Sequence, residues 1–216
     1  MLKKYYLNLE RSPERKKKFT NEWERFEAVD GASLPDNHPI LTRMVSMWNI
    51  SPKEHRGKCG CWMSHYNILS HIVNNKQNNV IVVEDDAIQM REIPDTLLKS
   101  KNFTYLGGYF SHKKMMDGEL KDNFPASIQG INILDRDTER ILMTLSYYIP
   151  HWTIARDIVN YLDSRNRVRA IDVMLHNVIR VPQDYIYPAI FIEEDIPSTI
   201  HTKSRRKHPD IHYRLR

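Results

Sequence analysis

The pattern of hydrophobic and polar positions is sharpest at residues 80–87, which read VIVVEDDA. Four consecutive β-branched residues form an apolar run that suits a short strand buried on both faces. The run ends in three carboxylates, Glu84, Asp85 and Asp86. In open α/β sheets, ligands bind in the crevice beyond the carboxyl ends of the strands. The pattern therefore predicts a central strand that carries acids to a binding site.

The segment before this strand begins with a β-α-β pattern. Residues 4–9 alternate between apolar and polar and predict a first strand. Ser12 and Pro13 are typical of a helix start, so we expect a basic helix over residues 13–24 and a second strand over residues 25–29. Such an opening is half of a nucleotide-binding crossover. It lacks both G-x-G-x-x-G and the phosphate-loop pattern, so neither a Rossmann dinucleotide site nor a P-loop is supported.

A helix over residues 60–73 is predicted from apolar residues that recur on one stripe. Ser64 and His65 lie beside that stripe near the expected helix start, and Arg56 and Lys58 come just before it. Helix starts and nearby cations attract anions, which indicates a place for a phosphate group. The alternative is that His65 is a structural hydrogen-bonding residue.

The remaining elements follow from the same reading. We expect further helices at residues 40–48, 94–100, 153–162 and 171–179, and strands at 103–106 and 185–192. Pro188 favours an edge position for the last strand. Residues 109–130 lack periodicity and predict a long loop that orders over a bound donor, and residues 203–216 predict a flexible basic tail.

Composition narrows the class of protein. With 216 residues, 41% of them hydrophobic and 27% charged, the chain fits one large globular domain. No apolar run is long enough to span a bilayer, and the N-terminus lacks a secretory signal, so we expect a cytoplasmic protein. Cys59 and Cys61 form neither a disulfide framework nor a complete zinc site, and we interpret both as buried, reduced thiols. The net charge of +5 suits an anionic small ligand, a membrane surface or nucleic acid.

The three adjacent acids carry the candidate chemistry. Neighbouring carboxylates repel one another unless a cation neutralises them. Mg²⁺ or Mn²⁺, shared with a phosphorylated ligand, is the simplest such cation. The alternative is that Glu84, Asp85 and Asp86 are solvated acids that close a strand into a turn.

Four of these segments together resemble glycosyltransferase family 25, which contains bacterial lipooligosaccharide galactosyltransferases and collagen galactosyltransferases. The matching stretches are YYLNLERSPERK (5–16), RFEAVDG (25–31), GCWMSHYNILSHIV (60–73) and VIVVEDDA (80–87), with a weaker match at 170–179 and 197–200. The resemblance implies an α/β fold of the GT-A type in residues 1–202, with a mostly parallel twisted sheet flanked by helices. It also implies a nucleotide-sugar donor, usually a UDP-sugar, and a divalent metal, normally Mn²⁺.

The resemblance also assigns roles to residues. Asp86, with Glu84 and with His201 near the C-terminus, matches the metal ligands of the family. Asp172 matches the base of many inverting GT-A enzymes, although an Asp before an apolar helix is also a common helix cap. The residues expected to contact the donor are Leu7, Asn8, Arg11, Val29, Asp30, Lys58, His65, Glu84 and Asp85.

The predicted function is therefore metal-dependent transfer of a hexose from a UDP-sugar to a glycan or glycoprotein, with inversion. A catalytically inactive nucleotide-sugar binding module is one alternative. A basic nucleic-acid-binding protein is another, but acids at the centre of the sheet would repel its phosphates and no nucleic-acid-binding motif is present.

Overall fold

The computed structural model describes residues 1–45, 52–112, 129–178, 180–194 and 213–214. Its main sheet has the strand order β2-β1-β3-β7-β5-β8-β6, and β10 pairs with β5 outside this path. The strands are β1 (Lys3–Asn8), β2 (Glu24–Glu27), β3 (Val80–Glu84), β5 (Phe103–His112), β6 (Gly130–Ile133), β7 (Glu139–Ile149), β8 (Gln183–Tyr187) and β10 (Tyr213–Arg214). β1 is parallel to β2 and β3, and β5 is parallel to β8, whereas β7 runs antiparallel between β3 and β5.

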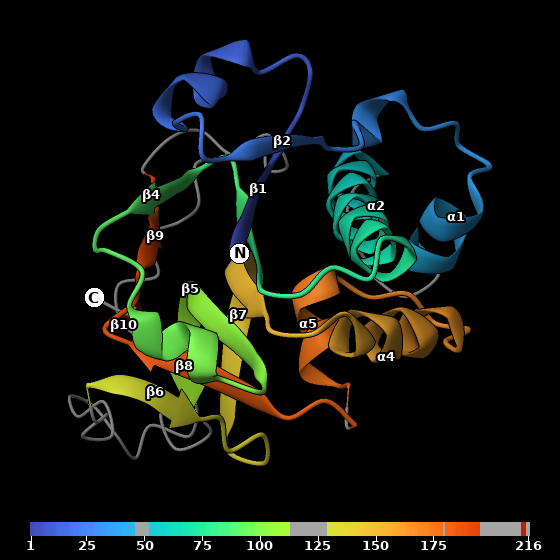
Figure 1. Cartoon of the computed structure of the whole chain (residues 1–216). Coiled ribbons are helices and arrows are strands. Elements are labelled where there is room, and N and C mark those ends of the chain that lie inside the picture. The colour runs from blue at the N-terminus through green and yellow to red at the C-terminus, as the bar shows by residue number, and fades with distance from the viewer. Residues whose placement is uncertain (46–51, 113–128, 179, 195–212, 215–216) are drawn as a thin grey trace.

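Helices lie beside this sheet, as Figure 1 shows for the group on its right-hand side. They are α1 (Pro39–Val45), α2 (Pro52–Asn74), α4 (Trp152–Asp163) and α5 (Ile171–His176), and three 3-10 turns are η1 (Pro13–Lys18), η2 (Gly31–Ser33) and η3 (Asp95–Lys99). A second, two-stranded sheet joins β4 (Ala87–Gln89) to β9 (Phe191–Glu193). The fold is α/β with a central sheet flanked by helices, as predicted, and the sheet combines the parallel pairs of β2, β1 and β3 and of β5 and β8 with antiparallel pairs through β7, β6 and β10. Within the described part of the chain, no helix has the length and apolar character needed to cross a bilayer.

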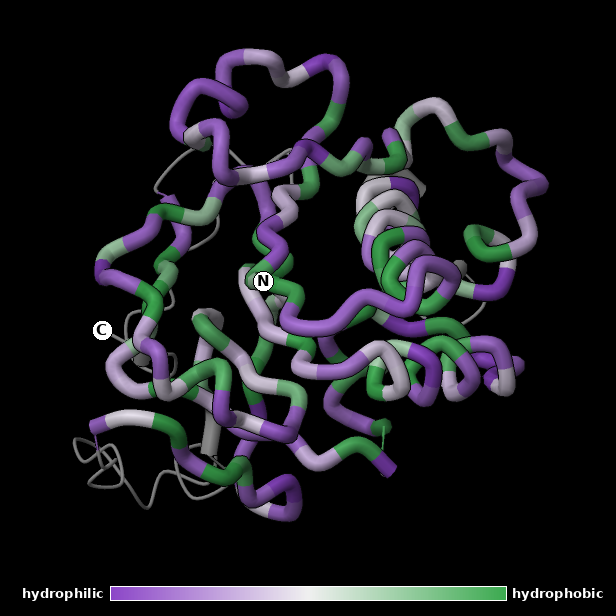
Figure 2. The backbone as a smooth tube through the Cα atoms, in the orientation of Figure 1, coloured by the Kyte–Doolittle hydropathy of each residue, from purple (hydrophilic) through white to green (hydrophobic). Residues whose placement is uncertain are grey.

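Strand β3 lies at the centre of two hydrophobic cores. Val80 and Val82 pack into the larger core, which also contains residues of α2, α4 and α5. Ile81 and Val83 pack into a smaller core on the opposite face. All four side chains are fully buried, which confirms the prediction of a strand covered on both faces. Figure 2 shows hydrophobic positions gathered along the central strands, and mostly hydrophilic ones in the connection between β1 and β2.

The helix expected over residues 13–24 is wrong in length and type. A 3-10 turn over Pro13–Lys18 replaces it, and Ser12 makes no side-chain capping hydrogen bond. The turn itself has no buried residue, so no apolar face favours its extension into an amphipathic helix. Phe19 instead stacks on Tyr6 with ring centroids 4.2 Å apart, and Trp23 packs edge-on against Phe191.

Helix α2 begins at Pro52, eight residues before the predicted start at residue 60. Pro52 is the first helical residue, where its missing N–H is harmless. Arg56, Lys58, Ser64 and His65 therefore all lie inside the helix. The predicted phosphate site at a helix start near Ser64 and His65 is wrong, because the N–H groups there are within the helix.

Three further predictions, all in the C-terminal half of the chain, are corrected. Residues 185–192 do not form one edge strand, because β8 ends at Tyr187 before Pro188 and lies between β5 and β6. Residues 109–112 belong to β5 rather than to a loop, and β6 begins at residue 130. Tyr213–Arg214, in the expected flexible tail, pairs with β5. Residues 113–128 of the predicted loop and residues 203–212 and 215–216 of the predicted tail lie outside the described residues.

Helix α2 approaches the end of β2 closely at Gly60. A Cβ atom on Gly60 would lie 2.6 Å from both Val29 O and Gly31 N. Gly60→Ala is therefore expected to lower the free energy of unfolding by about 1–3 kcal/mol through overpacking. An unconstrained helical glycine would show the opposite sign, a gain of up to about 1 kcal/mol.

Urea unfolding of the two proteins measures this difference. Asn67→Ala is the matched control, because Asn67 is exposed on the same helix and the change adds no atom there. A Gly60→Ala variant that is more stable than the parent chain would refute the close approach of the Val29–Gly31 backbone.

Candidate functional site

The three acids after β3 have three different environments. Glu84 Oε1 accepts a hydrogen bond from Thr144 Oγ1 at 2.6 Å and lies 3.2 Å from His65 Nε2. Asp85 is buried, accepts a hydrogen bond from Asn8 Nδ2 at 2.7 Å and pairs with Arg15 at 2.8 Å. Asp86 Oδ1 is shielded from solvent and has no hydrogen-bond partner among the described residues.

The environment of Asp86 suits a cation. Burial raises the pKa of Asp86 to about 7, and the carboxylates of Glu84, Asp85 and Glu193 act in the same direction. A buried acceptor without a partner is unfavourable in the absence of a ligand. Oxygen ligands of this kind fit a hard divalent ion such as Mn²⁺ or Mg²⁺. The residues present therefore fit the predicted metal, with Asp86 as the best candidate ligand.

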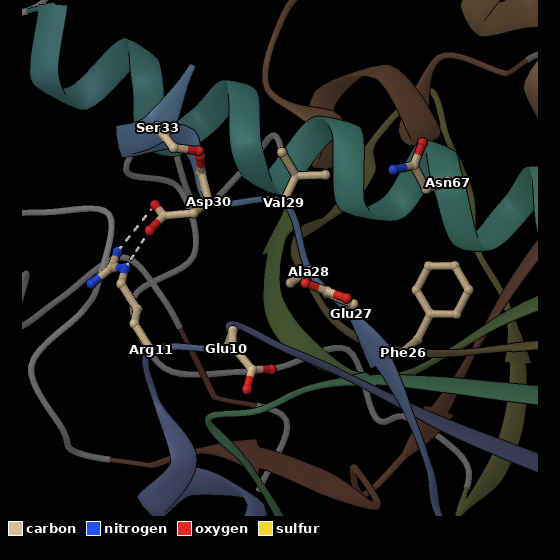
Figure 3. A pocket seen from close by; sticks show the side chains of 9 residues that line it. All are labelled: Glu10, Arg11, Phe26, Glu27, Ala28, Val29, Asp30, Ser33 and Asn67. Carbon is tan, nitrogen blue, oxygen red and sulfur yellow. Dashed lines mark hydrogen bonds and ion pairs between the residues drawn. The ribbon is translucent and has the colours of Figure 1, made fainter.

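An open pocket of about 730 Å³ lies at the carboxyl ends of β1 and β2. Figure 3 shows its lining, with Asp30 and Arg11 directed toward each other on one side and the Phe26 ring on the other. Arg11 Nε and Asp30 Oδ2 form an ion pair at 2.6 Å, and the Arg11 side chain is half exposed. The lining residues are Glu10, Arg11, Phe26, Glu27, Ala28, Val29, Asp30, Ser33 and Asn67.

Residues of the second and third sequence motifs form the wall of this pocket. Val29 N donates to Ser64 Oγ at 2.8 Å, and Ser64 Oγ donates to Gly60 O at 2.7 Å. Asp30 Oδ1 accepts from Ala32 N at 2.9 Å, which begins the η2 turn. Ser64, which the sequence placed near an anion, thus fixes the backbone of residue 29 against α2.

Asn8, the last residue of β1, contacts one of the three acids. Its side chain is fully buried, donates to Asp85 and to Ser12 O, and accepts from Arg25 Nε at 3.2 Å. Because β1, β2 and β3 are parallel neighbours, their carboxyl ends lie at the same edge of the sheet. The pocket and the three acids therefore lie at the same edge of the sheet, although none of these three acids is among the residues that line the pocket.

Asp172 lies in the first turn of α5, where it is half-buried. Its Oδ2 accepts a hydrogen bond from Met143 N at 3.0 Å, and its Oδ1 accepts one from Val173 N at 2.7 Å. Met143 has a φ of 71°, so Asp172 holds an irregular part of β7. The predicted alternative role as helix cap is wrong, because Ala170 is the N-cap of α5 and Asp172 lies within the first turn, where it holds the backbone of β7 instead.

Cys61 is the residue that sequence reasoning missed. Burial raises the pKa of its thiol well above the usual value, and the carboxylates of Glu84, Asp172 and Asp86 raise it further. Of these acids, Glu84 has a carboxylate oxygen within 4.8 Å of Cys61 Sγ. The sequence contained a signal for the proximity of Cys61 to His65: the two are four residues apart in a predicted helix, and residues i and i+4 share a helix face.

The other predicted site residues are dispersed. Leu7 is buried in the larger core, and neither Leu7 nor Asn8 lines the pocket. Lys58 lies on α2, half-buried and away from the pocket lining. His65 is buried beneath the site, where Nδ1 lies 2.9 Å from Tyr147 Oη. His201 lies outside the described residues.

A family comparison decides the affiliation of the chain. The sequence model of glycosyltransferase family 25 (LPS biosynthesis protein) matches residues 1–175. The chain belongs to glycosyltransferase family 25. The part of this family 25 chain that the model matches includes Cys61, Asp172 and the three acids after β3. Glu193 lies beyond it.

Individual relatives agree with this affiliation. A "Glycosyltransferase 25 family member" of Aedes aegypti is 34% identical over 137 residues, which are 54% of this chain and 22% of the relative. One of Anopheles gambiae is 34% identical over 94 residues, or 38% of this chain and 16% of the relative. The chain thus spans about a fifth of the length of these curated relatives.

A solved structure gives a weaker likeness. The CTP:phosphocholine cytidylyltransferase of Streptococcus pneumoniae superposes with a TM-score of 0.36 at 14% identity, over 62% of this chain and 57% of that chain.

Proposed function

We propose that this chain transfers a sugar from a nucleotide-sugar donor, a UDP-hexose, to a hydroxyl group of a glycan or glycoprotein. The observation that carries the proposal is that the buried Asp86 carboxylate follows β3 at the same edge of the sheet as the pocket at the ends of β1 and β2. Membership of glycosyltransferase family 25 supports the reaction class. The arrangement also agrees with the GT-A type of fold that the resemblance implies.

The pocket would hold the nucleoside part of the donor. Its carboxylates, from Glu10, Glu27 and Asp30, are acceptors for ribose hydroxyl groups and for a base N–H. The half-buried Phe26 ring offers an apolar surface for the base. The pocket carboxylates repel the diphosphate, so the diphosphate would extend out of the pocket toward Asp86. A cation there would neutralise the charges of the diphosphate and of the Asp86 carboxylate.

Asp86 would hold Mn²⁺ or Mg²⁺, together with Glu84 or a residue outside the described ranges such as His201. A bound divalent ion stabilises the negative charge that develops on the leaving diphosphate. Asp85 does not compete for it in this structure, because Asn8 and Arg15 occupy its two oxygens. Arg15, 2.8 Å from Asp85, places a guanidinium group at the same strand end.

Asp172 would accept the proton of the attacking hydroxyl group in an inverting transfer. A carboxylate near the acids and at the start of α5 is suitably placed to orient the acceptor. Its two backbone hydrogen bonds favour the alternative in which Asp172 is only structural and the chain binds a nucleotide sugar without transferring it.

A thermal-shift panel of nucleotide sugars with Mn²⁺ tests the proposal. A ligand at 100 times its Kd stabilises by about 2.7 kcal/mol, which corresponds to about 5–10 °C in a chain of this size. We expect such a shift with a UDP-sugar and Mn²⁺, and a smaller one when EDTA replaces the metal. Slow hydrolysis of the same donor separates a transferase from a binding module. The proposal fails if no nucleotide sugar shifts the transition at millimolar concentration.

A further inference from the structure

Three side chains between α2 and the end of β3 meet in an arrangement that suits a second ion. Cys61 and His65 lie one turn apart on α2, and Glu84 ends β3. Cys61 Sγ, a ring nitrogen of His65 and a carboxylate oxygen of Glu84 all lie within 4.8 Å of one another. The His65 Nε2 to Glu84 Oε1 distance is 3.2 Å. Two ligand atoms on one tetrahedral zinc ion stand about 3.3 Å apart, so this pair needs almost no movement to share an ion.

The chemistry of this donor set differs from that at Asp86. A thiolate, an imidazole and a carboxylate are ligands of Zn²⁺, whereas Mn²⁺ and Mg²⁺ favour carboxylate oxygens and do not favour a thiolate. We propose that Cys61, His65 and Glu84 form a second metal site, which takes a thiophilic divalent cation of the Zn²⁺ class. Three protein ligands leave the fourth position for water or for a neighbouring carboxylate.

The surroundings support the ligands as they do in metal sites. The other ring nitrogen of His65, Nδ1, lies 2.9 Å from Tyr147 Oη, a bond of the kind that orients a metal-binding imidazole. Thr144 Oγ1 holds the Glu84 carboxylate at 2.6 Å. The carboxylates of Asp172 and Asp86, which act on the Cys61 thiol, place further negative charge where a cation would lie. Glu84 is the residue that this site shares with the predicted Mn²⁺ ligands.

Occupancy of the site is independent of the proposed sugar transfer, since it is measured without a donor. Co²⁺ is the probe, because a thiolate bound to Co²⁺ gives a near-ultraviolet charge-transfer band that oxygen and nitrogen ligands do not give. The full chain, reduced and stripped of metal, is titrated with Co²⁺ and then with Zn²⁺. We expect a band that saturates at about one Co²⁺ per chain and that Zn²⁺ abolishes.

The two cysteines provide matched variants. Cys61→Ser is expected to abolish the band, whereas Cys59→Ser, two residues away and outside the cluster, is expected to retain it. Glu84→Gln keeps both thiols and is expected to weaken Co²⁺ binding at least about tenfold. Circular dichroism checks that each variant is folded, and if Cys61→Ser is not, the Glu84→Gln result decides. A parent chain without a thiolate band, a band that survives in folded Cys61→Ser, or unchanged affinity in Glu84→Gln overturns the proposal.

Discussion

Asp86→Asn is expected to reduce Mn²⁺-dependent donor turnover by at least about 100-fold, the size of effect seen when a group that stabilises transition-state charge is removed. The structure provides the reason, since Asp86 Oδ1 is buried and no described residue hydrogen-bonds to it. Turnover is measured as release of the nucleotide diphosphate from a UDP-sugar over a range of Mn²⁺ concentrations. Asp85→Asn is the matched control, because Asp85 is committed to Asn8 and Arg15.

The same change is expected to stabilise the metal-free chain at pH 8. Burial, with Glu84 and Asp85, raises the pKa of Asp86 to about 7, above its unfolded value near 4. A group with a raised pKa supports folding while protonated, and this support is lost as the pH rises through 7. At pH 8 the parent chain therefore carries an unfavourable buried charge that Asn lacks. Urea unfolding at pH 5 and pH 8 measures the difference.

Normal Mn²⁺-dependent turnover in the Asp86→Asn variant would place the metal site elsewhere.

Asp172→Asn is expected to lower kcat by about 10²–10⁴-fold, the usual contribution of a general base. The amide oxygen of Asn retains an acceptor for Met143 N, which the carboxylate holds at 3.0 Å, while the NH₂ group replaces the oxygen that accepts from Val173 N in the first turn of α5. The irregular backbone around Met143 is therefore preserved while the basic oxygen is removed. The affinity for the donor should change little, which single-turnover kinetics and donor titration together resolve.

Asp172→Ala separates the two roles of this residue. Alanine removes the acceptor for Met143 N as well as the base, so it is expected to lower stability by about 1–3 kcal/mol relative to Asn through an unpaired N–H group. A structural role alone predicts a stable Asp172→Asn variant with nearly normal turnover. That outcome would leave the transfer reaction without its proposed base and would favour the nucleotide-sugar binding module.

Local sequence determined the central strand and its acids. Residues 80–83 are β-branched and apolar, and that combination is compatible with little other than a strand covered on both faces, where the structure places them. Residues 25–31 and 60–73 also lie where the motif order predicted, one at the pocket and the other in the helix beside it. The α/β class followed because each strand-like run was separated from the next by a helix-like or turn-like one.

The elements that sequence reasoning misplaced depend on contacts distant along the chain. Gly60 resembles a helix start locally, but it lies inside α2, which begins at Pro52, and the backbone of Gly31, 29 residues earlier, packs against it. The place of β8 between β5 and β6 depends on pairing with residues more than 50 positions earlier in the chain. Propensity and periodicity describe neighbours within a few residues, so neither reports such pairings.

The roles of the three adjacent acids were likewise decided only by tertiary structure. In the sequence, Glu84, Asp85 and Asp86 are three adjacent carboxylates, and the residue type alone does not distinguish which of them would bind a metal. In the folded chain Glu84 contacts His65 and Thr144, Asp85 contacts Asn8 and Arg15, and Asp86 keeps a buried oxygen without a described partner. The sequence by itself determined that acids end a buried strand. Only packing against β1, α2 and β7 decided which carboxylates are held by neighbouring side chains and which keeps an oxygen without a described partner. Those neighbours come from separate parts of the chain, so the local sequence does not report them.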